Sequence, residues 1–127
     1  MNVQLTKAEE QVMQIVWSLE ECTVQDIREK FDDPKPARTT IATVLTVLKN
    51  KGFVRHETFG RVNVYYPEIA KTNYSKTQLS GILKNYFNDS FAAMTSFFAK
   101  ENDLTLEEMD RILDEARKEL KNRSKGL

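Results

Sequence analysis

Cysteine, histidine and long apolar stretches are scarce in this chain of 127 residues. It contains one cysteine, Cys22, and one histidine, His56. A single cysteine excludes an internal disulfide and a multi-cysteine zinc site, and few soft ligands remain for any other metal. No apolar run is long enough to span a bilayer, and the N-terminal residues do not resemble a secretory signal. We therefore expect a cytoplasmic protein without membrane insertion.

The chain also lacks the residue combinations that common enzymes use. It has no evident Ser/His/Asp set, no phosphate-binding glycine loop and no metal-ligand spacing. Its carboxylate pairs, such as Glu9-Glu10 and Glu107-Glu108, lie where helices are expected to start. We therefore predict no enzymatic activity and no cofactor.

Charge is distributed unevenly along a chain that is neutral as a whole. The 19 basic residues balance the 19 acidic ones, yet the segment 35–61 carries a net charge of +5. Its only acidic residue is Glu57, and its cations are Lys35, Arg38, Lys49, Lys51, Arg55 and Arg61. A basic segment in a neutral protein favours docking on a phosphate backbone.

Two short helices are predicted before the basic segment. Thr6 and Glu9 form a capping box, which satisfies backbone N–H groups at a helix start, and the following apolar periodicity continues to about Glu21. A similar cap at Thr23 begins a second helix, and Pro34 ends it because proline cannot continue a helix.

A third helix is predicted from Arg38 to Lys51. Its apolar residues recur at helical spacing and are Ile41, Val44, Leu45 and Leu48. The opposite face carries hydroxyl and amide side chains, namely Thr39, Thr43, Thr46 and Asn50. Gly52 follows at the position of a left-handed C-terminal cap.

Two short strands, 53–58 and 62–66, follow with a turn at 59–61. Three helices and a hairpin are the plan of a winged helix-turn-helix, so the third helix is expected in the major groove. Arg55 and Arg61, on the hairpin, are expected to contact phosphates. Two alternatives remain open: the threonine face is an ordinary solvated face, or the module binds a protein instead of DNA. The basic hairpin favours DNA, since a protein-binding module would not need it.

The C-terminal part differs in character. One long helix is predicted from about Tyr74 to Lys100, and a capping box at Thr105 begins the last helix. Their apolar side chains exceed what one chain can cover, which favours a symmetric homodimer. The predicted dimerisation residues are Leu79, Leu83, Tyr86, Phe87, Phe91, Met94, Phe98, Met109, Ile112, Leu113 and Ala116. The expected fold is therefore mainly α, with a winged helix-turn-helix domain at 1–71 and a helical dimerisation domain at 72–127.

Three segments of the chain resemble the penicillinase-repressor family, the BlaI/MecI/CopY group of bacterial repressors. They are Leu5–Trp17, Thr40–Val54 and Tyr65–Pro67, and the resemblance extends over nearly the whole chain. It implies a homodimeric winged-helix repressor on palindromic operators upstream of resistance genes. It also implies induction by proteolysis downstream of a membrane sensor or, in the copper branch, by metal.

The resemblance also suggests roles for single residues. Thr39, Thr40 and Thr43 match the start of the family's recognition helix, and Arg61 lies in its wing. The family's cleaved Asn-Phe bond aligns with Ser96-Phe97, where Phe97 is expected to be buried and a sensor-linked protease would act. The cysteine pairs of the copper branch are absent, which argues against metal induction. The complete predicted DNA-binding set is Arg38, Thr39, Thr40, Thr43, Thr46, Asn50, Arg55 and Arg61.

Overall fold

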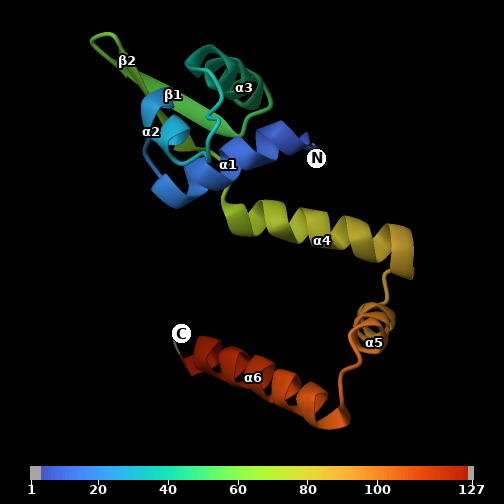
Figure 1. Cartoon of the computed structure of the whole chain (residues 1–127). Coiled ribbons are helices and arrows are strands. Elements are labelled where there is room, and N and C mark those ends of the chain that lie inside the picture. Colours follow the sequence, from blue (N-terminus) through green and yellow to red (C-terminus); the bar gives the residue numbers. More distant parts are fainter. Residues whose placement is uncertain (1–3, 126–127) are drawn as a thin grey trace. The chain divides into compact units, whose positions relative to one another are not determined.

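The computed structural model describes residues 4–125 (Figure 1). The chain divides into two compact units, 1–78 and 79–127. The described part is helical except for one antiparallel hairpin, in the order α1 Lys7–Leu19, α2 Val24–Glu29, α3 Arg38–Asn50, β1 Val54–Phe59, β2 Val62–Pro67, α4 Lys71–Phe87, α5 Phe91–Glu101 and α6 Leu106–Lys125. This is the predicted mainly α fold, a winged helix-turn-helix followed by C-terminal helices.

The predicted caps define the first helices. Thr6 accepts a hydrogen bond from the Glu9 backbone N–H, and the Glu9 side chain accepts one from the Thr6 backbone N–H. The same reciprocal pair joins Thr23 and Asp26 at the start of α2. Helix α1 ends at Leu19, slightly before the predicted Glu21, because the next residue turns into the left-handed region.

The first unit has a continuous apolar core. Helices α1, α2 and α3 contribute fully buried side chains to it, and the hairpin covers it with Phe53, Val54 and Tyr65. The fully buried helical side chains are Met13, Val16, Ile27, Ile41, Leu45 and Leu48. Their burial fixes which face of α3 points outward, because the apolar stripe of α3 can only face this core.

Strands β1 and β2 pair from Val54 opposite Pro67 to Phe59 opposite Val62. The base of the hairpin is attached to the core, because Cys22 and Tyr65 exchange two backbone hydrogen bonds of 3.1 and 2.7 Å. The tip is a two-residue turn at Gly60 and Arg61. Gly60 has a φ of 64°, which suits the first central position of a tight hairpin turn. The hairpin is therefore held at one end and free at the other.

The first turn of α4 belongs to the core of the first unit. Tyr74 is buried, and its ring centroid lies 5.6 Å from those of both Trp17 and Phe53. The compact division accordingly falls after Gln78 rather than after the predicted residue 71. The assignment of a separate function to each part is not settled by this division and stays a prediction.

The prediction of one continuous helix over 74–100 is wrong, because the structure has two helices there. Helix α4 ends at Phe87 and α5 begins at Phe91. Asn88 and Asp89 between them have φ values of 49° and 62°, and the Ser90 side chain accepts a hydrogen bond from the Ala93 N–H. Two left-handed residues followed by an N-cap end one helix and start the next, even though the apolar spacing continues through them.

Candidate nucleic-acid interface

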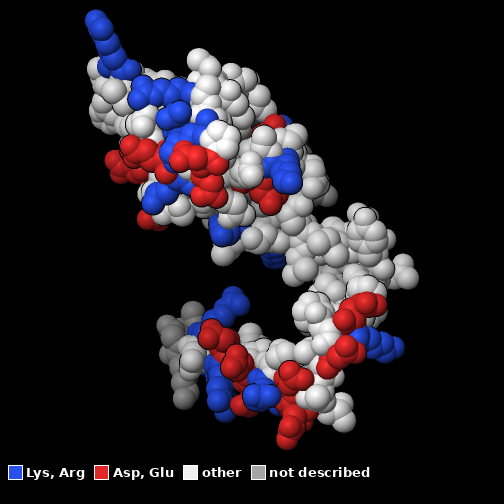
Figure 2. Space-filling view, in the orientation of Figure 1, with Lys and Arg blue, Asp and Glu red and all other residues white. Residues whose placement is uncertain are grey.

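One face of α3 is buried and the other is free. Arg38, which begins the helix, is exposed, and so are the predicted reading residues Thr39, Thr40, Thr43, Thr46 and Asn50. Since α3 packs its opposite face into the core, this polar face is presented by a rigid element. Figure 2 shows the part of α3 visible in that view as largely uncharged. A neutral, hydroxyl-rich face suits contact with base edges better than with phosphates alone.

The threonine hydroxyls on this face are oriented by the helix itself. Thr43 donates a hydrogen bond of 2.9 Å to the Thr39 carbonyl, and Thr46 donates one of 3.1 Å to the Ala42 carbonyl. Because the hydroxyl hydrogen is used inside the helix, the oxygen lone pairs and the methyl group remain for an outside partner. These groups can accept a hydrogen bond from an amino group of a base or contact a thymine methyl.

The N-terminus of α3 favours an anion. Ala37 at the N-cap provides no side-chain hydrogen bond, and the first turn contains no acidic residue. Its N–H groups therefore lack the side-chain partners that α1 and α2 have. Arg38 stands at the same end. A phosphate oxygen close to this turn would be stabilised both by these N–H groups and by the positive end of the helix dipole.

The two wing arginines have different surroundings. The Arg55 guanidinium lies 3.3 Å from the Glu57 carboxylate and 3.1 Å from that of Glu68, and it stacks over the Tyr66 ring at 4.3 Å. Arg61 at the turn is exposed and forms no ion pair within residues 4–125. Arg61 is thus the more available of the two for phosphate.

A hollow of about 440 Å³ brings the start of α3 and the wing tip together. Arg38 and Arg61 line it from separate elements. The other lining residues were not predicted from the sequence and are Thr23, Val24, Gln25, Val62 and Asn63. The cap at Thr23 and the hairpin register were available signals for them, but the meeting of α2 with the wing depends on how the core packs. Two cations on one concave surface form a suitable docking place for a phosphate backbone.

The chemistry of catalysis or metal binding has little support in the described residues. Residues 4–125 contain no cluster of three His, Cys, Asp or Glu side chains that could hold a metal ion. Burial, with a smaller effect of nearby Asp26, raises the pKa of the Cys22 thiol to about 11, so this thiol stays protonated. Within the same residues no helix is both long and apolar enough to cross a membrane.

Within residues 79–123 the second unit has no buried core. Within 79–123 every side chain is exposed or half-buried, and α4 and the helices after it present large apolar groups to solvent. Of the predicted dimerisation residues, four are half-buried, namely Leu83, Phe87, Met94 and Met109. The others are exposed, namely Leu79, Tyr86, Phe91, Phe98, Ile112, Leu113 and Ala116.

The proposed cleavage bond lies in α5. Ser96 is exposed, and the predicted burial of Phe97 is wrong for the single chain, because its side chain is 54% exposed. The Phe97 ring packs against the Phe87 ring, and the two ring centroids lie 5.6 Å apart. With no buried core within residues 79–123, its own chain covers this large aromatic side chain only in part.

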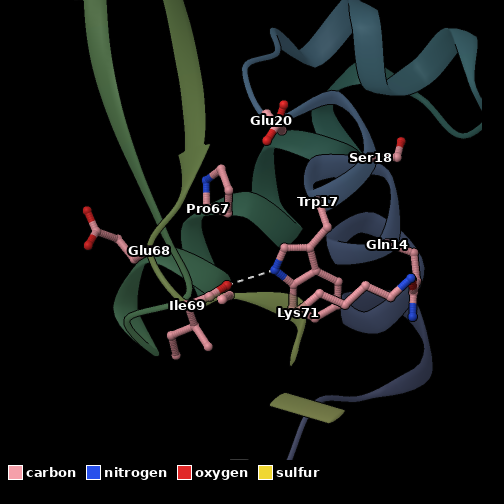
Figure 3. A pocket seen from close by; sticks show the side chains of 9 residues that line it. Gln14, Trp17, Ser18, Glu20, Pro67, Glu68, Ile69 and Lys71 are labelled. Carbon is pink, nitrogen blue, oxygen red and sulfur yellow. Dashed lines mark hydrogen bonds between the residues drawn. The ribbon is translucent and has the colours of Figure 1, made fainter. Parts of the chain in front are cut away.

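A second hollow, of about 490 Å³, lies beside Trp17 on α1 (Figure 3). The Trp17 indole N–H donates a hydrogen bond of 2.8 Å to the Ile69 carbonyl in the link between β2 and α4. Trp17 therefore has a packing role, since it holds this link against α1.

Comparison with known proteins identifies the family. A family model described as Penicillinase repressor matches residues 5–118, most of the chain. The chain belongs to the penicillinase repressor family. Its members are transcriptional repressors rather than enzymes, so the chain is a DNA-binding repressor of the winged helix-turn-helix type.

Individual relatives are similar over nearly their full length. The Penicillinase repressor of Bacillus licheniformis is 28% identical over 123 residues, which cover 96% of this chain and 95% of the relative. The methicillin resistance regulatory protein MecI of Staphylococcus aureus (strain N315) is 22% identical over 110 residues, covering 86% and 89%. The solution structure of the Bacillus licheniformis BlaI monomeric form with the blaP half-operator is 30% identical with a TM-score of 0.47, covering 57% of this chain and 89% of that one.

Proposed function

We propose that this family member is a cytoplasmic repressor that binds palindromic operators as a homodimer and controls a resistance or stress operon. The observation that carries the proposal is that Arg38, which begins the helix with the free, hydroxyl-rich face, lines one hollow together with Arg61. Base-reading groups and phosphate-binding cations then lie on one surface, as sequence-specific binding requires. The names of the relatives, a penicillinase repressor and a methicillin resistance regulator, support a resistance operon.

The second unit supports dimerisation. A monomeric protein rarely exposes many large apolar side chains together, and here Tyr86 is 77% exposed, Phe91 63% and Phe98 59%. A second copy of the same chain offers a complementary apolar surface under two-fold symmetry. Two DNA-binding domains held on one two-fold axis bind more tightly than a single domain, because the second domain binds at a high effective concentration.

Selection of DNA by the full-length chain tests this function. Duplexes enriched from a random library should contain an inverted repeat, and their complex should contain two chains by sedimentation. Enrichment of a single half-site would contradict the dimeric mode. If no sequence is enriched over random DNA at moderate salt, the result would favour the alternative in which the module binds a protein.

Release of the operator by proteolysis completes the proposal. The amide bond between Ser96 and Phe97 lies within a helix, so a protease needs that turn to open locally before cleavage. Helix α5 has no buried residues, which makes such opening easier than in a packed helix. Cleavage here would separate α6 and part of α5 from the DNA-binding domain and would weaken the dimer.

An immunoblot that follows the intact chain in its native host after exposure to a β-lactam tests this release. The intact chain should disappear as transcription of the regulated operon rises. Derepression with the chain still intact would exclude cleavage as the switch.

A further inference from the structure

The C-terminal end of α1 lacks the positive charge that a helix end favours. The last carbonyl groups of a helix have no N–H partner within it, and they give that end a partial negative charge. The last turn of α1 contains no basic residue, and its C-cap is Glu20. Glu21 follows, so two carboxylates stand where a lysine or an arginine would be stabilising. This end of α1 therefore favours a cation from outside the helix.

The hollow of about 490 Å³ beside Trp17 lies at this end of α1. Trp17 and Glu20 line it from α1, and Pro67 lines it from the end of β2. Figure 3 shows the Trp17 indole between these two elements, with Glu20 above it. A concave site with apolar walls and a few polar groups is typical of places where small organic molecules bind.

The charges that line the hollow are not equally available to a ligand. The Glu68 carboxylate lies 3.1 Å from the Arg55 guanidinium, which neutralises it in part. The Lys71 side chain runs below the indole toward Gln14, whereas Glu20 lies above the indole (Figure 3). Glu20 forms no ion pair within the described residues. The Glu20 side of the hollow therefore carries a carboxylate without a counter-ion.

The indole of Trp17 is held in place for contact with a ligand. Its N–H donates to the Ile69 carbonyl at 2.8 Å, and its ring lies 5.6 Å from that of Tyr74, centroid to centroid. Trp17 is nevertheless only half-buried, and it lines the hollow. The face of an indole attracts a cation through its quadrupole and also offers a large apolar contact area. Pro67 provides a second apolar wall.

We infer that this hollow binds an organic cation with an apolar body, of the arylalkylamine class. The ammonium group donates hydrogen bonds to the Glu20 carboxylate and to the last carbonyls of α1, and the aryl group packs against Trp17 and Pro67. A primary ammonium suits the site because its three N–H donors meet oxygen acceptors. Such binding goes beyond the proposed function and does not depend on it, since this hollow shares no lining residue with the hollow of Arg38 and Arg61.

Trp17 is the only tryptophan of the chain, so its fluorescence reports directly on this hollow. The full-length chain is titrated with three probes that share one phenylbutyl group: the cation 4-phenylbutylamine, the neutral 4-phenylbutanol and the anion 5-phenylpentanoate. Isothermal titration calorimetry measures the same affinities without relying on the fluorophore. The variants are Glu20→Gln and, as matched control, Glu21→Gln, which removes an exposed neighbouring carboxylate that does not line the hollow.

The wild-type chain should bind the amine roughly fivefold more tightly than the alcohol, the effect expected of one partly exposed ion pair, and should bind the anion most weakly. Glu20→Gln should lower the affinity for the amine to that for the alcohol and leave the affinity for the alcohol unchanged. Glu21→Gln should keep the wild-type preference for the amine. Both glutamates are exposed, so both variants should fold, and a thermal melt of each checks this.

Three results would overturn the inference. They are equal wild-type binding of the amine and the alcohol, an unchanged affinity of Glu20→Gln for the amine, and the absence of both a fluorescence change and heat with every probe. Equal losses in Glu20→Gln and Glu21→Gln would also contradict it, because they would indicate a general attraction to the acidic end of α1. The titrations contain no DNA, so their outcome is distinct from the success or failure of operator selection.

Discussion

The ammonium group of Lys51 lies 2.5 Å from the carboxylate of Glu9, joining the end of α3 to the start of α1. Lys51 is the C-cap of α3, and Glu9 also accepts the backbone N–H of Thr6 in the cap of α1. The ammonium group additionally donates to the Gln4 carbonyl at 3.4 Å. One ion pair therefore connects α3 to the N-terminal helix and helps to fix the orientation of α3.

The hydrogen bond from Lys51 holds the pKa of the Glu9 carboxyl below its ordinary value, although burial opposes this. A lowered folded-state pKa contributes stability that is complete above the ordinary carboxyl pKa and is lost as the pH falls through the folded value. Glu9→Gln should cost about 1–2 kcal/mol near neutral pH.

Urea unfolding at a series of pH values measures this cost. The difference in the free energy of unfolding between Glu9→Gln and the wild-type chain should fall toward zero in acid. The exposed Glu21→Gln is the control and should follow the wild-type curve. A difference for Glu9→Gln that stays constant down to the acid end would rule out the Lys51 pair as its cause.

Thr43 is predicted to distinguish specific from random DNA. Its oxygen lone pairs and methyl group are free on the exposed face of α3, so Thr43→Ala should cost about 1–3 kcal/mol on the selected operator and little on random duplexes. Thr77→Ala is a matched control, because Thr77 makes the same type of bond to its own helix, donating to the Asn73 carbonyl at 3.1 Å. Gel shifts on both kinds of duplex give the two losses. Equal losses for Thr43→Ala would show that α3 is not the reading element.

Arg38 and Arg55 should differ in their effect on salt dependence. Arg38 lines the hollow and forms no ion pair within the described residues, so Arg38→Ala should lower the slope of log K against log salt by about one. Arg55 is already paired with Glu57 and Glu68, so Arg55→Ala should change the slope by less. Titrations at several salt concentrations compare the two, and a larger change for Arg55 would reverse this assignment.

The position of the domain boundary predicts the behaviour of two fragments. Residues 1–78 should form a folded monomer that binds operator weakly, because they include Tyr74 and its contacts with Trp17 and Phe53. Residues 1–71 should be less stable by about 3–5 kcal/mol, the usual cost of removing a buried aromatic side chain. Chemical unfolding of both fragments measures the difference, and Tyr74→Ala in the longer fragment should reproduce most of it. Equal stability of the two fragments would place the boundary at residue 71 after all.

The exposed apolar surface of the second unit predicts a dimer. The full-length chain should sediment as a dimer at micromolar concentration, and Phe98→Asp should shift it toward the monomer and weaken operator binding by on the order of 100-fold. Lys84→Asp, an equally drastic charge change at an exposed polar position of α4, is the control and should remain dimeric. A monomeric wild-type chain in this experiment would contradict the dimer.

Local features of the sequence determined much of the first unit. Thr6 with Glu9 and Thr23 with Asp26 set helix starts through side-chain to backbone bonds that depend only on neighbours in sequence. The periodicity of Ile41, Leu45 and Leu48 likewise determined which face of α3 is buried. These features are short-range, so the sequence alone predicts them.

Tertiary structure decided what depends on residues distant in sequence. The break at Asn88 is the exception, because it is local: two left-handed residues there end a helix that the apolar spacing alone would continue. The burial of Tyr74 and the ion pairing of Arg55 arise from packing and from the position of Glu68 across the hairpin. The common hollow of Arg38 and Arg61 exists because α3 and the wing share one core, and a contact of that kind follows from packing in three dimensions rather than from any local pattern.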